Sequence, residues 1–386
     1  MAGSLAELVR DKRDADVAEP LVTFVDVAAD GTLKDERRSY AELWIRGQAI
    51  AGWLRRQGIA PGDRLAIMMI NQPEFVDAMV AAAITGAVWV PIDPRARGEK
   101  LQHMLDFAGC SGVIAADDCA GALADVAPAC PQLRWTLLTG DGASKAGLPA
   151  CTLLADIGES TGQPLADVAP ADPMFMMFTS GTTGNPKAVV QSHGEWMAYA
   201  RASQIAFQPE DRLYTGLSLT HINAQSFLRL ALGQGVPVVI SRKFTKSRLW
   251  EILRAYTCTI FSLLGGMIPE VYAAPEKPDD ADNPVRLIIS SGMPAELWEG
   301  YRKRFGVEIQ EGYGSTEGGG GLFNLPGRGA APRRVCSPRC SMRRATAARQ
   351  ACQANCASVR KAAKRSPSPI TGTKRPAAPR SGTAGS

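Results

Sequence analysis

Short apolar runs of strand length alternate with helical patterns along most of this chain, and this alternation constrains its fold more than any other feature. In the first third, apolar runs at 65–70, 88–92 and 112–115 are separated by helical patterns at 73–85 and 98–107. Uniformly apolar strands are typical of a parallel sheet that helices cover on both faces. The sequence therefore predicts an α/β fold built from βαβ units.

A segment rich in Gly, Ala, Asp and Pro at 139–171 interrupts the alternation, which then resumes and continues to about residue 311. Segments of this composition commonly separate domains. We therefore predict two βαβ subdomains with mostly parallel sheets, at 1–150 and 151–327, with an approximate boundary between them. Residues 328–386 form a tail of different character.

The stretch DPMFMMFTSGTTGNPKA at 172–188 joins an apolar run to a loop rich in glycine and hydroxyl groups. Glycines let backbone N–H groups converge on an anion, and hydroxyl and ammonium groups add donors, so the predicted ligand is a polyphosphate. A Walker loop is excluded because two residues separate Gly184 from Lys187. The alternative is an ordinary surface turn. The candidate binding residues are Thr179, Ser180, Gly181, Thr182, Thr183, Gly184 and Lys187.

The tail differs from the rest of the chain in charge. Residues 1–317 hold 29 basic and 38 acidic residues, a net charge of −9, whereas the residues after Glu317 carry +14 and no acidic side chain. Beyond about Gly327 the sequence lacks aromatic residues and has few branched apolar ones, so we expect disorder. Such a tail could attract nucleic-acid phosphates, but without aromatic side chains it could not stack on bases.

We favour a shifted reading frame as the origin of the tail, with a genuine basic tail and a zinc site as the alternatives. A shifted frame in GC-rich coding DNA fits the composition, because such translations are rich in Arg, Ala, Pro, Gly and Ser. A zinc site would be formed by Cys336, Cys340, Cys352 and Cys356, although their spacing is looser than in familiar zinc ribbons.

The N-terminal region and the other cysteines predict a cytoplasmic protein. The first 20 residues lack the apolar core of a signal peptide, and the most apolar stretch, 78–92, is too short and too interrupted to span a bilayer. The five cysteines before the tail show no paired spacing, so we expect reduced thiols in the core. They are Cys110, Cys119, Cys130, Cys151 and Cys258. The oligomeric state is not indicated.

Four segments together carry a family resemblance. TSGTTGNPKA at 179–188 and YGSTE at 313–317, with SYAEL at 39–43 and GAVWVPIDP at 86–94, closely resemble the adenylate-forming (AMP-binding) superfamily of acyl-CoA synthetases, luciferases and peptide-synthetase adenylation domains. The resemblance covers about residues 20–325. Within the superfamily, THINAQ at 220–225 looks like bacterial acid:CoA ligases of the carnitine/crotonobetaine type or related enzymes.

The resemblance implies a fold and a reaction. The fold is the large N-terminal domain of adenylate-forming enzymes. In the reaction, a small-molecule carboxylic acid attacks the α-phosphate of ATP, with Mg²⁺ bound, to give an acyl-adenylate. Coenzyme A, as cosubstrate, then displaces AMP to give the thioester. Positioning and charge neutralisation carry most of the first step.

The resemblance also implies roles for individual residues. Residues 179–187 would hold the β- and γ-phosphates, Thr316 would bond the α-phosphate, and Glu317 would bind Mg²⁺. Tyr313 and Gly314 would contact adenine, with a core aromatic as the alternative for Tyr313. The turn bearing Ser291, Gly292 and Met293 would run beside the base. His221 would lie between the acyl and nucleotide pockets, with a buried, hydrogen-bonded histidine as the alternative. For His193 we expect a structural role.

The chain departs from the family pattern after YGSTE. The family continues with an aspartate that holds the ribose hydroxyls and with a mobile C-terminal lid domain that carries a lysine, yet no Asp follows Asp282 here. We therefore expect that the lid domain is absent and that adenylation is severely impaired. The alternatives are a non-catalytic nucleotide- or acyl-binding module that uses its basic tail for anionic partners, and a chain that does not fold stably.

Overall fold

The computed structural model describes residues 2–15, 20–141, 147–179, 187–203, 205–314, 321–323 and 333–335. The chain divides into two compact units, residues 1–335 and 336–386. The second unit, which holds most of the predicted tail, lies outside the described residues, and so do the four cysteines of the zinc alternative.

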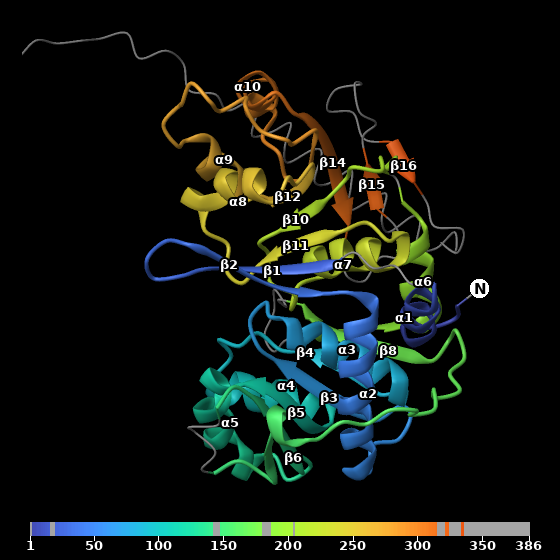
Figure 1. Cartoon of the computed structure of the whole chain (residues 1–386). Coiled ribbons are helices and arrows are strands. Elements are labelled where there is room, and N and C mark those ends of the chain that lie inside the picture. Colours follow the sequence, from blue (N-terminus) through green and yellow to red (C-terminus); the bar gives the residue numbers. More distant parts are fainter. Residues whose placement is uncertain are drawn as a thin grey trace, which may run out of the picture. The chain divides into compact units, whose positions relative to one another are not determined.

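Two sheets form the first unit, and most of their strands are parallel (Figure 1). The seven-stranded sheet has the order β7-β6-β5-β3-β4-β8-β9, and only the β8–β9 pair is antiparallel. Its strands are β3 (Arg64–Met68), β4 (Val88–Pro91), β5 (Cys110–Ala116), β6 (Trp135–Thr139), β7 (Cys151–Leu153), β8 (Pro173–Thr179) and β9 (Lys187–Ser192).

The nine-stranded sheet has the order β16-β15-β14-β13-β12-β10-β11-β1-β2. Its middle strands, from β14 to β1, are parallel, and antiparallel pairs lie at both edges. Its strands are β1 (Val22–Val27), β2 (Leu33–Arg38), β10 (Leu213–Thr215), β11 (Val238–Ser241), β12 (Ile260–Leu264), β13 (Leu287–Ser291), β14 (Glu308–Gly314), β15 (Gly321–Phe323) and β16 (Arg333–Val335).

The helices follow the strands as the alternation in the sequence predicts. The α-helices are α1 (Leu5–Asp14), α2 (Tyr40–Arg56), α3 (Pro73–Thr85), α4 (Gly98–Ala108), α5 (Ala120–Val126), α6 (His193–Arg201), α7 (Ile222–Gln234), α8 (Leu249–Ala255), α9 (Met267–Tyr272) and α10 (Ala295–Phe305). Four short 3₁₀ helices lie at Asp117–Cys119, Ala127–Ala129, Leu154–Asp156 and Lys246–Arg248. No helix within the described ranges is both long and apolar enough to cross a membrane.

Helices cover both faces of the seven-stranded sheet, which confirms the predicted α/β layering. On β3, Leu65 and Ile67 join the buried cluster that contains α2 and α3, whereas Ala66 and Met68 join the cluster that contains α4 and α5. This alternation is the two-residue period of a strand buried on both faces. Figure 1 shows α2 and α3 on one side of these strands and α4 and α5 on the other.

Local sequence signals explain where α2 and α3 begin and end. Ser39 caps α2 in a capping box: its hydroxyl accepts from the Glu42 amide, and the Glu42 carboxylate accepts from the Ser39 amide. Pro73 occupies the first turn of α3, and Gly86 ends that helix with a φ of 73°, a left-handed conformation that glycine adopts at little cost.

Three expectations about individual elements were wrong. The run at 174–178 was expected to form a fully buried strand, but β8 pairs with β9 at the sheet edge, and Met176 and Phe178 are half-buried. The helix expected at 194–207 ends at Arg201, and the strand expected at 213–219 ends at Thr215. The two sheets do not divide at the predicted boundary near residue 150. β1 and β2, which precede it, belong to the nine-stranded sheet, and β8 and β9, which follow it, belong to the seven-stranded sheet. The domain ranges themselves stay a prediction.

The cysteines lie where the sequence predicts. Cys110, Cys119, Cys130 and Cys258 are buried free thiols, and Cys151 is half-buried. Burial raises the pKa of Cys110 and Cys119 to about 12, so these thiols stay protonated at neutral pH.

Candidate functional site

The β8–β9 hairpin positions the glycine-rich loop. β8 lies parallel to β4, so its last residue, Thr179, stands at the carboxyl edge of the sheet, where ligands bind in open α/β folds. Thr179 pairs across the hairpin with Lys187, and the Thr179 hydroxyl donates to the Lys187 carbonyl at 3.4 Å. The Lys187 side chain is exposed. The loop between them, with Ser180, Gly181, Thr182, Thr183 and Gly184, lies outside the described residues.

A second turn at the carboxyl edge of the other sheet is held by one carboxylate. Glu311 on β14 accepts from the backbone amide of Gly292 at 2.6 Å, from that of Met293 at 3.3 Å, and from the buried hydroxyl of Ser290. Gly292 has a φ of 91°, which side-chain-bearing residues rarely adopt. Glu311 thus holds the turn that the sequence predicts beside the base and that also contains Ser291.

The YGSTE segment begins at the end of β14. Tyr313 and Gly314 are the last residues of that strand, which lies parallel to β13, so both strands end at the same edge as the turn at Ser291. The structure describes the backbone of Tyr313 but not its side chain, and Thr316 and Glu317 lie outside the described residues. Their predicted roles stay predictions.

His221 lies at the start of α7 and is exposed. Its backbone N–H donates to the Ser218 carbonyl at 2.9 Å. A hydrogen bond from Arg95 is the main reason why the pKa of Asp93 lies below its usual range, and His221 lowers that pKa further. His221 is therefore close to Asp93, which follows β4 of the other sheet. The alternative of a buried, hydrogen-bonded histidine is wrong.

Asn71 joins the carboxyl ends of strands from the two sheets. It follows β3 and is 3% exposed. Its side-chain amide donates to the carbonyls of Leu217 at 2.8 Å and Ser241 at 2.9 Å, and its carbonyl accepts from the Leu219 amide at 2.8 Å. These partners follow β10 and end β11, so Asn71 fixes the segment that leads to His221 against the seven-stranded sheet.

His193 is fully buried at the start of α6, as its expected structural role requires. Its backbone N–H donates to the Asp172 carbonyl at 3.0 Å, and neither ring nitrogen has a hydrogen-bond partner within the part of the chain that the structure describes. Burial lowers the pKa of the imidazole, which is therefore neutral at pH 7.

Sequence reasoning missed Asn71 and Glu311, although both carry a recognisable signal. Asn71 follows β3 closely and Glu311 lies within β14, so both are polar residues toward the carboxyl ends of parallel strands, where ligand-binding loops begin. Within the described part of the chain, no group of three or more His, Cys, Asp or Glu side chains is arranged to hold a metal ion.

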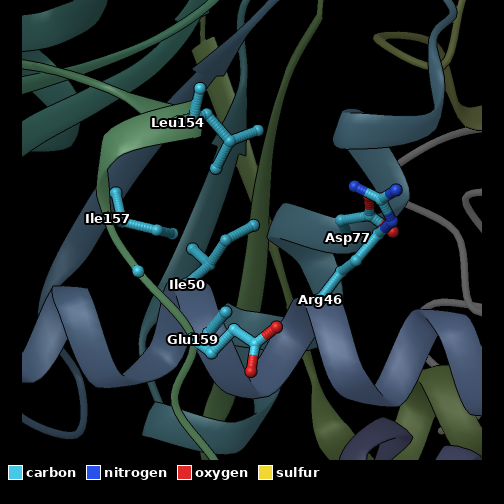
Figure 2. A pocket seen from close by; sticks show the side chains of 9 residues that line it. Arg46, Ile50, Asp77, Leu154, Ile157 and Glu159 are labelled. Carbon is cyan, nitrogen blue, oxygen red and sulfur yellow. The ribbon is translucent and has the colours of Figure 1, made fainter.

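A pocket of about 260 Å³ lies away from these residues, between α2, α3 and the segment 154–159 (Figure 2). Its wall is largely apolar, with Ile50, Leu154 and Ile157, while Arg46 and Asp77 lie together at one end. Asp77 pairs with the buried Arg38 at 3.3 Å, and burial still raises the pKa of Asp77 to about 7. None of the predicted site residues lines this pocket.

Comparison with known proteins shows similarity across most of the described chain. The family model described as AMP-binding enzyme matches residues 19–343. The chain is 29% identical over 297 residues to the medium/long-chain-fatty-acid–CoA ligase FadD6 of Mycobacterium tuberculosis, covering 75% of this chain and 48% of that protein. It is 30% identical over 301 residues to human long-chain fatty acid transport protein 1, covering 75% and 46%. The chain thus spans about half the length of these relatives.

Solved structures share the fold. The N-terminal domain of FACL13 from Mycobacterium tuberculosis matches with a TM-score of 0.68 and 24% identity, covering 83% of this chain and 78% of that one. The anthranilate CoA ligase AuaEII in complex with anthranoyl-AMP matches with a TM-score of 0.74 and 18% identity, covering 86% and 65%. The expected adenylate-forming architecture is confirmed.

Proposed function

Because the chain belongs to the family of AMP-binding enzymes, we propose that it catalyses the ATP-dependent activation of a carboxylic acid and its transfer to coenzyme A. In the first step, an oxygen of the acid attacks the α-phosphorus of ATP and pyrophosphate leaves. In the second step, the coenzyme A sulfur attacks the acyl carbon and AMP leaves. The carnitine/crotonobetaine-type assignment is a finer prediction within this class.

The main observation in support of this proposal is that loops from both sheets lie next to each other at one edge. The hairpin that bears Thr179 and Lys187 ends at the carboxyl edge of one sheet, and Asn71 fixes the loops after β10 and β11 of the other sheet against the same edge. Two substrates that must react with each other need two adjacent sets of contacts held at fixed distance. This edge offers both.

The chain's own residues would act mainly by positioning and by charge. The exposed ammonium of Lys187 would neutralise phosphate charge, and the turn fixed by Glu311 would lie along the base. His221 would lie between the nucleotide and the acid. Glu317 is the predicted ligand of a Mg²⁺ ion, which when bound would neutralise phosphate charge; that residue lies outside the described range.

The alternative function is a non-catalytic module that binds a nucleotide or acyl group and uses residues 328–386 for anionic partners. Nearly all of those residues lie outside the described part of the chain, so this alternative stays a prediction. It predicts nucleotide binding without acid-dependent exchange of pyrophosphate into ATP.

Lys187→Ala tests the proposal, with Lys303→Ala as its control. Both lysines are exposed, but Lys303 lies on α10 and takes no part in the candidate site. Removing Lys187 should weaken ATP binding roughly tenfold or more, measured by titration calorimetry, because a phosphate contact by a charged group is lost. Lys303→Ala should bind ATP like the wild type. Equal ATP affinity in the two variants would contradict the placement of the phosphates.

Acid-dependent pyrophosphate exchange measures the activity itself. Exchange with a panel of carboxylic acids would establish adenylation and identify the acid, and its rate tests the predicted impairment. ATP binding with no exchange for any acid would favour the non-catalytic module.

A further inference from the structure

Arg229 is a buried cation that forms no ion pair within the described residues. It lies in the middle of α7, between the apolar residues Leu228 and Leu230, and is 2% exposed. Burial lowers its pKa to about 10, so the guanidinium still carries its charge at pH 7. The charge of Glu195 on α6 favours the charged form, but no ion pair joins it to Arg229 within the described residues, and buried charges are normally paired.

The contacts of Arg229 leave one edge of the guanidinium unused. Its Nη1 donates to the side-chain carbonyl of Gln191 at 2.9 Å, and the group lies over the ring of Phe175 at 4.7 Å. The Tyr199 ring lies 5.4 Å away. Nε and Nη2 are enclosed and have no hydrogen-bond partner among the residues that the structure describes. These two nitrogens form the edge that donates two parallel hydrogen bonds to a carboxylate, so the unused donors match a bidentate acceptor.

Arg229 contacts the face of the β8–β9 hairpin to which Thr179 and Lys187 also belong. Phe175 and Gln191 are cross-strand partners, as are Met177 with Val189 and Thr179 with Lys187. Side chains two residues apart share a face of a strand. The face that Arg229 contacts at Phe175 and Gln191 therefore includes Thr179 and Lys187. These two residues lie four positions along the strands, about 13 Å away at roughly 3.3 Å per residue.

The length of α7 gives a similar distance between Arg229 and the carboxyl edge of the sheet. His221 precedes the helix and lies near Asp93, which follows β4, so α7 starts at the carboxyl edge. Arg229 is eight positions further on, about 12 Å at 1.5 Å per residue. Ile222, Ser226 and Arg229 share one face of the helix, and the first two are half-buried. Ile222 stands near the edge where the acid would be activated, and Arg229 lies on the same helix face seven residues further along.

We propose that Arg229 binds a second carboxylate at the far end of the acid substrate, so that the preferred substrates are dicarboxylic acids of medium length. One carboxylate would be activated near His221 and Lys187, and the other would accept from Nε and Nη2 of Arg229. The substrate class rests on the proposed function. Gln191 and Phe175 act as positioning residues that hold the guanidinium.

The test compares acids of equal length that differ only at the far end. The intact chain is titrated calorimetrically, with ATP present, against decanedioate and decanoate, and then against the series from hexanedioate to dodecanedioate. The wild type should bind decanedioate at least tenfold more tightly than decanoate, because a bidentate charged contact is added. Equal affinities in the wild type would overturn the inference, whatever the variants show.

Two substitutions and a control locate the effect. Arg229→Met keeps the approximate length of the side chain and removes the charge. This variant should therefore bind decanoate more tightly than decanedioate, the reverse of the wild type. Arg229→Lys keeps the charge but not the bidentate edge and should retain a reduced preference. Arg201→Met makes the same change on the exposed surface of α6 and should leave the preference unchanged. A preference for decanedioate that survives Arg229→Met would also overturn the inference.

Thermal unfolding separates a binding role from a structural one. Replacing an unpaired buried cation by an apolar side chain of similar size should leave the unfolding temperature unchanged or raise it. An Arg229→Met protein that fails to fold would show that the guanidinium is required for the fold and would contradict a role reserved for substrate. Failure of the proposed function is distinguishable, since it predicts no pyrophosphate exchange with any acid, whereas failure of this inference alone leaves exchange with monocarboxylic acids and no preference for dicarboxylic acids.

Discussion

Replacing Asn71 by Ala should damage both the stability of the fold and the assembly of the site. The three hydrogen bonds of this side chain connect the residue after β3 to the segment after β10 and to the end of β11. Asn71 itself is 3% exposed. Each lost bond costs about 1 kcal/mol, and buried partners that stay unsatisfied add to this cost. The loss should therefore be about 3 kcal/mol or more.

Asn283 offers a matched control for this substitution. Its amide donates to the carbonyls of Asp280 at 2.8 Å and Phe305 at 3.0 Å, and its carbonyl accepts from the Val285 amide at 3.0 Å. The pattern of three bonds is the same, but Asp280 and Val285 lie between α9 and β13, and Phe305 ends α10. Asn283 is also half-buried, so water can replace part of what is lost. Asn283→Ala should cost less stability and leave the site intact.

Thermal unfolding and ATP titration together measure the two effects. At about 2 °C per kcal/mol, the low end of the range for larger domains, Asn71→Ala should lower Tm by roughly 6 °C or more. It should also weaken ATP binding at temperatures well below Tm, because hydrogen bonds no longer hold the carboxyl edges of the two sheets together. Asn283→Ala should lower Tm by less and bind ATP normally. If Asn71→Ala binds ATP as tightly as Asn283→Ala does, the tie between the sheets does not assemble the site.

Three further predictions concern the turn at Gly292 and the buried His193. Glu311→Gln should weaken ATP binding several-fold in calorimetry, because a neutral amide replaces a carboxylate that accepts from Ser290, Gly292 and Met293; an unchanged affinity would disconnect this turn from the nucleotide. Gly292→Ala should lower the unfolding free energy by about 1 kcal/mol in urea titrations, because its φ of 91° strains any residue with a Cβ. Burial lowers the pKa of His193, so the unfolded chain binds the proton more tightly and stability should fall as pH drops below about 6.5. His193→Phe should flatten this fall in unfolding measured between pH 7 and 5, and an unchanged slope would assign the acid sensitivity to other groups.

The elements that the sequence predicts best are those with complete local signals. The helix expected at 73–85 is α3, Pro73–Thr85, because Pro73 starts it and Gly86 ends it within the segment itself. The capping box of Ser39 and Glu42 likewise fixes the start of α2. Local backbone preferences and side-chain caps determine these boundaries, so no knowledge of distant residues is needed.

Elements that depend on distant partners could not be predicted. The segment LKDERR of β2 is almost entirely polar, and it is a strand because it pairs with β1 at the sheet edge. The half-buried state of Met176 follows from the position of β8 next to the edge strand β9, which the apolar run alone does not reveal.

The candidate site was predictable in its loops but not in the residues that hold the loops together. Glycine and hydroxyl patterns point to the segment between Thr179 and Lys187, because its chemistry is local. The roles of Asn71 and Glu311 depend on partners from other strands. Arg229 had a sequence signal, a single charge inside the apolar run FLRLAL, which could have marked it before the structure did.

The pairing of β1 with β11 also means that β1 is made long before its parallel partner. Val22 lies opposite Val238, so the two partners are separated by 216 residues of chain. At about 5–20 residues per second, a ribosome needs on the order of 10–40 s to produce β11 after β1 has been made. During that time the apolar residues Val22 and Phe24 have no parallel neighbour to cover them. We therefore expect the nascent segment of β1 to benefit from a chaperone until β11 has been made.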